Sequence, residues 1–209
     1  MAKELKIKRG ETFTIVVMWE TDPVIRKPIT AISLASGAPR LTVAGHGAPD
    51  GWRGKPYGVE GMRPINDIGF QDMKVIDSNT IEFNAVTPVD DLGRLWPAYT
   101  SGGFLMFKTP KDLTDYDPVI DIKDKIGGTA WATSQGGSPT ISATKDNATK
   151  QIVIRMSAVD TAAIPMSTKR GFAELEMHNS GDPSDVFKLS IIEGEDGPNV
   201  VTVSGEVTT

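Results

Sequence analysis

Short runs of alternating apolar and polar residues recur along the whole chain, and residues that favour turns separate nearly all of them. In the first run the apolar side chains occupy alternate positions, at Phe13, Ile15, Val17 and Trp19. Successive side chains of a strand point to opposite faces, so this spacing predicts a half-buried strand that ends before Asp22-Pro23. Because 21 glycines and 14 prolines are spread between such runs, we predict an all-β fold.

Similar runs predict further strands at Arg40–Val43, Met73–Val75, Thr80–Asn84, Phe104–Phe107, Pro118–Lys123, Thr140–Ser142, Gln151–Met156, Phe172–Met177, Phe187–Ile192 and Val200–Ser204. One segment has a helical pattern instead. Ser157 and Asp160 are spaced as in a loose capping box ahead of helix-forming residues, and Pro165 would stop the helix. We therefore expect one short helix between Ser157 and Pro165.

Composition excludes several classes of function. The 22 Lys and Arg against 27 Asp and Glu give a net charge of −5, and no long basic run occurs, so nucleic acid is not an expected partner. The longest apolar run, Ile15–Trp19, is far shorter than the roughly 20 residues of a membrane span, and no apolar stretch follows the N-terminal charges. We expect no membrane insertion and no secretory signal. The absence of cysteine removes disulfides, thiolate catalysis and zinc–thiolate sites.

Other chemistry lacks its motif. The two histidines, His46 and His178, would need carboxylates to complete a metal site, and the acidic cluster of residues 112–124 lacks the EF-hand pattern. No Gly-x-Ser-x-Gly elbow occurs, and Gly51–Lys55 is too short for a phosphate loop. We expect no catalytic site, no metal and no cofactor. Residue counts leave a Ser-His-Asp triad or a carboxylate pair such as Asp90 and Asp91 open.

The most distinctive stretch combines two turn motifs in residues 45–52 and 59–66. Pro49, Asp50 and Gly51 form a strong turn signal, while glycines permit positive φ around the histidine and ahead of the methionine. The residues that we assign to this structural turn motif are Gly45, His46, Gly47, Pro49, Asp50, Gly51, Gly61 and Met62.

Residues 29–109 resemble the small β-barrel called the first catalytic cysteine half-domain of ubiquitin-activating enzymes, in the version found in phage tail proteins. The matching positions are His46, Gly47, Gly51, Val59, Gly61, Met62, Ile65, Asn66, Val75, Asp77, Thr80, Ile81 and Phe83. The chain departs from the pattern at Ala48, where leucine is usual, and at Arg53–Tyr57, where a plain hydrophobic strand is expected. The resemblance implies a non-catalytic barrel, since the phage versions carry no catalytic cysteine.

The rest of the chain, residues 1–28 and 110–209, resembles the N-terminal domain of phage baseplate upper proteins. The matching segments are Lys6–Phe13, Asp112–Tyr116, Ile120–Gly128, Ile152–Ile164, Gly171–Met177 and Val201–Val207. Lys123 stands where the family commonly has arginine. The resemblance implies a β-sandwich-like host domain that carries the barrel of residues 29–109 as an insertion. Pro28 and Pro110 would stiffen the two junctions.

The two resemblances imply a bacteriophage virion structural protein of the tail or baseplate. It would be made in the host cytoplasm and act as a connector or adaptor that docks tail fibres, spikes or neighbouring ring subunits in a symmetric homo-oligomer. The apolar loop around Leu95, Trp96, Pro97 and Tyr99 is the candidate interface with those partners. A capsid decoration or head-to-tail joining protein is an alternative, and a glycan-binding tail protein is a second one.

Overall fold

The structure is a computed structural model that describes residues 5–164, 169–191 and 199–204. The chain is all-β and divides into two compact units. The sandwich unit comprises Met1–Trp19, Asp112–Asn147 and Gln151–Thr209, and the inserted unit comprises Glu20–Lys111 with Ala148–Lys150. Pro165 and the end of the predicted Val201–Val207 segment lie outside the described residues.

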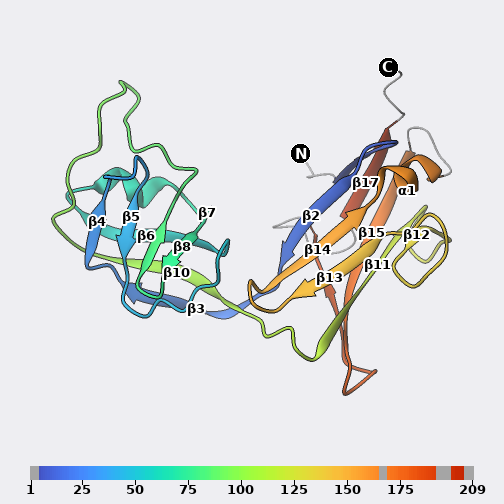
Figure 1. Cartoon of the computed structure of the whole chain (residues 1–209). Helices are drawn as coiled ribbons and strands as arrows, with labels where there is room; N and C mark the ends of the chain where they lie inside the picture. Colours follow the sequence, from blue (N-terminus) through green and yellow to red (C-terminus); the bar gives the residue numbers. More distant parts are fainter. Residues whose placement is uncertain (1–4, 165–168, 192–198, 205–209) are drawn as a thin grey trace. The chain divides into compact units, whose positions relative to one another are not determined.

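Two sheets pack face to face in the sandwich unit (Figure 1). The larger sheet has the order β1-β17-β15-β11-β12, with β16 also paired to β15, and its strands are β1 (Leu5–Lys8), β11 (Tyr116–Lys123), β12 (Ala130–Thr133), β15 (Lys169–Asn179), β16 (Val186–Leu189) and β17 (Asn199–Ser204). The smaller sheet has the order β13-β14-β2, with β2 (Phe13–Met18), β13 (Ser142–Asp146) and β14 (Gln151–Met156). Strands β1 and β17 run parallel, and the other pairs are antiparallel.

The core of the sandwich unit lies between these sheets. The alternation predicted for β2 is confirmed, because Phe13, Ile15, Val17 and Trp19 all pack into one cluster of buried apolar side chains. The opposite sheet contributes residues such as Ile120 to the same cluster. Burying apolar surface on one face of each sheet is the main favourable term in such a fold, at about 25 cal/mol per Å².

The predicted helix is confirmed as α1 (Ala158–Ala163). Ser157 is its N-cap, and the Ser157 hydroxyl accepts a hydrogen bond from the backbone N–H of Asp160. The buried hydroxyl of Thr161 lies 2.8 Å from the carbonyl oxygen of Glu11, just before β2, so the helix is tied to the sandwich unit by a polar contact as well as by packing. An N-cap such as Ser157 typically contributes about 1 kcal/mol to stability.

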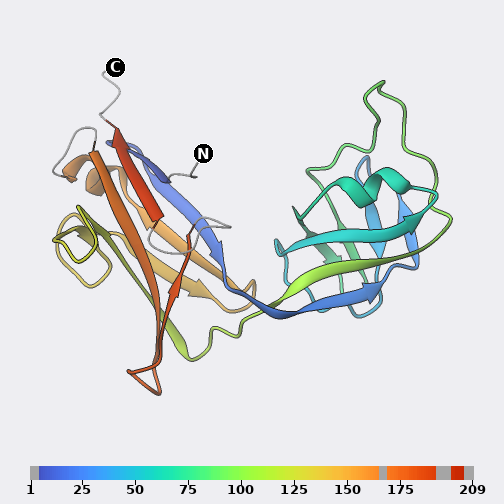
Figure 2. The ribbon, with the colours of Figure 1, turned by 180° about the vertical axis from the view of Figure 1, so that it is seen from behind.

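The inserted unit contains two four-stranded sheets and the 3-10 helix η1 (Arg63–Asp67) (Figure 2). The first sheet has the order β3-β10-β6-β7, with β3 (Glu20–Pro28), β6 (Arg53–Glu60), β7 (Gln71–Asp72) and β10 (Ser101–Pro110). The second has the order β4-β5-β9-β8, with β4 (Ala31–Ser33), β5 (Arg40–Thr42), β8 (Lys74–Asp77) and β9 (Thr80–Glu82). In the described residues the expected barrel is therefore built from two separate hydrogen-bonded sheets.

The first junction between the units lies earlier in the chain than the sequence suggested. We expected it near Pro28, but β3 belongs to the inserted unit because it pairs with β10 from Phe104↔Pro28 to Pro110↔Glu20. Asp22-Pro23 does not end the strand. Lys108 pairs with Val24 and the next residue of β10, Thr109, pairs with Thr21. Asp22-Pro23 therefore forms a bulge on β3 without ladder partners, and the missing N–H of the proline costs no sheet hydrogen bond. The second junction follows Lys111, close to Pro110.

Candidate interaction loop

A long loop joins β9 to β10, and we call residues 85–100 the projecting loop (Figure 1). Its tip folds back on itself, because Val89 and Leu95 form an antiparallel bridge and the N–H of Trp96 donates to the carbonyl oxygen of Pro88 at 2.9 Å. The N–H of Asp90 donates to the carbonyl of Arg94, and that of Gly93 donates back to Asp90, each at 2.9 Å. The tip therefore has a defined backbone conformation despite its length.

The carboxylate of Asp90 closes this tip. Its Oδ1 accepts hydrogen bonds from the backbone N–H groups of Leu92 and Arg94, both at 2.9 Å. Its Oδ2 accepts a hydrogen bond from Arg94 Nε at 2.8 Å and lies 2.7 Å from Arg94 Nη2. The backbone and side-chain hydrogen bonds from Arg94 lower the pKa of Asp90 below its ordinary value of 3.8. A carboxylate that is kept ionised in this way stabilises the turn and is poorly suited to act as a general acid with Asp91.

The tip held by Asp90 exposes leucine side chains. Leu92 is 75% exposed and Leu95 is 66% exposed, and Val89 is also an exposed apolar residue. Single exposed apolar residues are common on soluble proteins, but three within one ordered turn form a compact apolar surface. This surface has the composition and the rigidity of a protein contact site, since little chain entropy would be lost when a partner covers it.

The residues that the sequence assigned to an interface have two different roles in the structure. Leu95 and Pro97 are exposed and Trp96 is half-buried, so all three keep surface that a partner could contact. Tyr99 has another role: its hydroxyl lies 3.1 Å from the carbonyl oxygens of both Ile29 and Gly102, which share its single proton. It anchors the base of the loop to β10. Sequence reasoning missed Leu92, although Asp90 followed three residues later by Gly93 is a turn signal that could have indicated an exposed tip.

The base of the projecting loop rests on Gly61 of the turn motif. Gly61 has φ +82°, and a Cβ atom built there would lie 2.4 Å from the carbonyl oxygen of Ala98. The N–H of Thr100 donates to the carbonyl of Glu60 at 3.1 Å. Only glycine combines this backbone conformation with such a close approach. Met62, the next residue, is buried in the core of the inserted unit, so the motif links that core to the loop.

His46 is a structural residue of the inserted unit. Its ring is buried, Nδ1 accepts a hydrogen bond from the N–H of Ala48 at 3.1 Å, and Nε2 therefore donates to the carbonyl oxygen of Asp77 at 2.8 Å. Both ring nitrogens are used by backbone groups, which supports the interpretation of hydrogen bonding over metal binding. Gly45 and Gly47 on either side both have positive φ.

Asp50 fixes the second half of the same motif. Its Oδ1 accepts a hydrogen bond from the N–H of Val75 at 2.8 Å, and its Oδ2 lies 3.2 Å from Nζ of Lys74. The hydrogen bond from Val75 lowers the pKa of Asp50 below 3.8. The N–H of Trp52 donates to the carbonyl of Pro49 at 3.2 Å, and that of Gly51 donates to the carbonyl of Met73 at 2.9 Å. The turn thus places Trp52 in the core.

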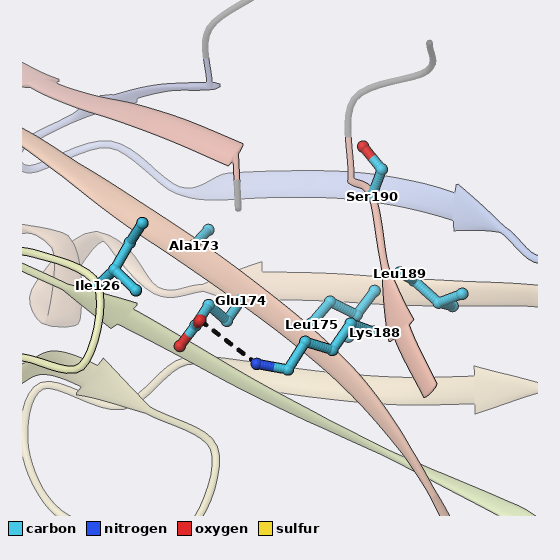
Figure 3. A pocket seen from close by; sticks show the side chains of 7 residues that line it. All are labelled: Ile126, Ala173, Glu174, Leu175, Lys188, Leu189 and Ser190. Carbon is cyan, nitrogen blue, oxygen red and sulfur yellow. Dashed lines mark ion pairs between the residues drawn. The ribbon is translucent and has the colours of Figure 1, made fainter. Parts of the chain in front are cut away.

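A cavity of about 310 Å³ lies in the sandwich unit beside β15 and β16 (Figure 3). Its lining residues are Ile126, Ala173, Glu174, Leu175, Lys188, Leu189 and Ser190. The charged groups that line it are already paired. Glu174 Oε1 lies 3.6 Å from Nζ of Lys188, and Glu174 Oε2 lies 2.6 Å from Nζ of Lys123. The hydrogen bond from Lys123 lowers the pKa of Glu174 below 4.5. Such a carboxylate serves a structural ion pair better than proton transfer.

Acidic residues of the described chain form no group of three or more with histidine that could hold a metal ion. In the cluster expected from the sequence, Asp112 Oδ1 accepts from the N–H and hydroxyl of Thr114, and Asp124 Oδ1 accepts from the N–H of Lys125. These are local turn contacts. Trp19, Trp52 and Trp131 are buried, so they do not form a sugar-stacking surface. No helix in the described ranges is long and apolar enough to cross a membrane.

Comparison with known proteins adds no relative: no protein-family model matches this chain, and no curated protein matches it.

Proposed function

We propose that this chain is a structural protein of a bacteriophage tail or baseplate, a connector that docks a fibre, a spike or a neighbouring ring subunit. The resemblances of residues 1–28 with 110–209 and of residues 29–109 to phage tail domains support this role. The all-β fold is compatible with it. In this proposal the sandwich unit docks on the particle, and the inserted unit presents the projecting loop to the partner.

One observation carries the proposal: Leu92 and Leu95 are exposed at the tip of a loop whose conformation is fixed by Asp90 and Arg94. A preorganised apolar tip can insert into a partner at a small entropic cost, and a symmetric assembly multiplies this modest contact by its copy number. The work is passive, since the contact requires neither a reaction nor a cofactor.

The proposal is tested in particles of the virus that encodes the chain. Wild-type chain is expected in purified tails, and Leu92→Ser with Leu95→Ser should yield particles that lack the fibre, spike or adjoining ring subunit. The matched control is Val159→Ser, which removes a side chain that is 80% exposed on α1 of the sandwich unit. This control should leave the particles complete.

Three results would overturn the proposal. Absence of the chain from particles removes the virion role, and recovery of the chain with tailless heads would favour the capsid decoration or head-to-tail joining alternative. Complete particles from the double leucine variant would show that the projecting loop is not the contact site. Circular dichroism and thermal unfolding of both variants establish that they are folded, since exposed-site changes should alter stability by at most about 0.5 kcal/mol.

A further inference from the structure

The outer face of the first sheet of the inserted unit carries an exposed apolar row. Phe104 on β10 lies directly opposite Pro28 on β3 and Tyr57 on β6. Phe104 is 46% exposed, Tyr57 is 61% exposed, and Pro28 is exposed as well. Adjacent strands are about 4.8 Å apart, so the row spans about 10 Å across the three strands. The side chains alternate with Leu105 and Phe107, which are buried on the inner face.

A basic row lies next to it on the same face. Met106 follows Phe104 by two positions on β10 and lies opposite Arg26 on β3 and Lys55 on β6. Lys108, two positions further on, lies opposite Val24. Within the described ranges, the ion pairs include none that involves Arg26, Lys55 or Lys108. Lys55 contacts an aromatic ring instead, with Nζ 5.1 Å from the centroid of Phe70.

We call the surface formed by Arg26, Pro28, Lys55, Tyr57, Phe104, Met106 and Lys108 the basic sheet face. Aromatic residues, methionine and arginine are the types that are enriched at the centres of protein interfaces. The cations outside the ion pairs restrict which partner can bind. A partner that covered them without supplying negative charge would leave them buried and uncompensated, which costs free energy. The composition therefore fits an acidic protein surface as the occupant.

The chain itself supplies such a surface. Residues 20–111 contain ten Lys and Arg against ten Asp and Glu, so the whole net charge of −5 belongs to residues 1–19 and 112–209. Four exposed aspartates lie on neighbouring loops and strand ends of the sandwich unit, which we call the acidic end: Asp112, Asp115, Asp117 and Asp182. Lys145 lies 3.1 Å from Asp117 Oδ1 and neutralises one of these four charges. Hydrogen bonds hold its loops together, since the N–H of Ser180 donates to the carbonyl of Asp115 at 2.8 Å and Asn147 Nδ2 donates to Asp112 at 3.1 Å.

We propose that the basic sheet face binds the acidic end of a second copy of this chain, in a head-to-tail contact. The two surfaces of one chain are different and complementary, so the contact is heterologous and can repeat around a ring. The inference rests on the proposed structural role and deepens it by naming one partner. It concerns a different surface from the projecting loop, and it requires no other viral protein.

The experiment uses the purified full chain in sedimentation velocity over a concentration series. Wild-type chain should self-associate at about 50 mM salt and dissociate at least about tenfold more readily at about 1 M, where the screening length falls to about 3 Å. A face-reversed variant, Arg26→Glu with Lys55→Glu, should be monomeric. An end-reversed variant, Asp115→Lys with Asp117→Lys, should be monomeric too.

Mixing the two variants gives the sharpest result. Two complementary contacts then become available: the reversed face of the first variant with the reversed end of the second, and the unaltered end of the first with the unaltered face of the second. The mixture should therefore associate although neither variant does so by itself. Such rescue also shows that both variants are folded. The charge-matched control is Lys125→Glu with Arg155→Glu, which changes the net charge equally at exposed positions of the sandwich unit and should associate like wild type.

The inference would be overturned by a wild-type chain that stays monomeric at low salt, by reversal variants that associate normally, by a control that fails like the face-reversed variant, or by a mixture that is not rescued. Binding of the basic sheet face to single-stranded DNA or to an anionic polysaccharide, without self-association, would also overturn it. A chain that is present in tails but monomeric in solution would reject this contact and leave the proposed function standing.

Discussion

Asp121 on β11 lies directly opposite Glu174 on β15, so their two carboxylates are neighbours on one face of the larger sheet. Like charges in this arrangement repel one another. Lys123 offsets the repulsion, because its Nζ lies 3.4 Å from Asp121 and 2.6 Å from Glu174. The hydrogen bond with Glu174 raises the pKa of Lys123 above 10.5 and lowers that of Glu174 below 4.5. The lysine is therefore a structural residue of the sandwich unit.

Replacing Lys123 by methionine should destabilise the protein at neutral pH by about 1–2 kcal/mol, because the two carboxylates then lose the cation that they share, and only the exposed Lys188, 3.6 Å from Glu174, remains beside them. The lowered pKa of Glu174 contributes stability above its ordinary value of 4.5, and that contribution is lost as the pH falls through the lowered value. In the variant the carboxylates are easier to protonate, so its deficit should shrink in acid. Urea unfolding of both proteins at about pH 7 and about pH 3.5 measures this difference.

The control for that comparison is Lys125→Met, which removes a nearby exposed lysine. It should change the free energy of unfolding by at most about 0.5 kcal/mol at either pH. An equal deficit for Lys123→Met at both pH values would contradict the assignment, because loss of packing by the lysine stem does not depend on protonation.

His46→Leu should destabilise the inserted unit by about 2–4 kcal/mol. The leucine keeps an apolar side chain in the site but leaves the N–H of Ala48 and the carbonyl of Asp77 without their ring partners. Hydrogen exchange of core amides of the inserted unit, such as that of Met73, reports on this unit by itself. The matched change His178→Leu removes a half-exposed ring and should cost less than about 1 kcal/mol, so equal losses would argue against the role of His46.

Gly61→Ala should destabilise the inserted unit more than Gly37→Ala. Both glycines have similar positive φ values, +82° and +85°, so both variants incur the backbone strain of about 1 kcal/mol. An added Cβ at Gly37 meets open space, whereas at Gly61 it would clash with the carbonyl of Ala98. The excess loss should accompany faster proteolysis of the projecting loop, because its base must move. Equal unfolding midpoints in urea for the two variants would exclude this link.

Alternation and turn chemistry predicted most of the strands of the sandwich unit from the sequence. The run at Gln151–Met156 matches β14 at both ends, because its β-branched residues alternate cleanly between core and surface. The prediction at Thr140–Ser142 was largely wrong, since β13 begins at Ser142 and carries polar residues on an edge strand, where no apolar face marks the register.

In the inserted unit the sequence signal was weaker. Strand β3 was missed because Asp22-Pro23 is typical of a strand end, although a bulge on β3 accommodates the dipeptide. Alternation did not predict strand β6, because Arg53, Lys55 and Tyr57 place charge and an exposed ring on its outer face, where the resemblance expects a plain hydrophobic strand. The basic sheet face could not be predicted either, because its members become neighbours only through the pairing of β3, β10 and β6.

The projecting loop should lose its fixed tip in acid. The pKa of Asp90 is lowered by the hydrogen bonds from Arg94, so the order that the carboxylate provides is present above its ordinary value of 3.8 and is lost as the pH falls through the lowered value. Asp90→Ala should produce the same loosening at neutral pH, seen as faster amide exchange at Leu92 and Arg94 and faster cleavage of the loop. The midpoint of global unfolding should stay that of the wild type, since the site is exposed. The control Asp91→Ala removes the neighbouring carboxylate and should leave exchange at both amides unchanged. If Asp90→Ala exchanges like wild type at neutral pH, the backbone contacts of the tip, Val89↔Leu95 and Trp96 to Pro88, suffice to hold it, and Leu92 and Leu95 are presented without the help of the carboxylate.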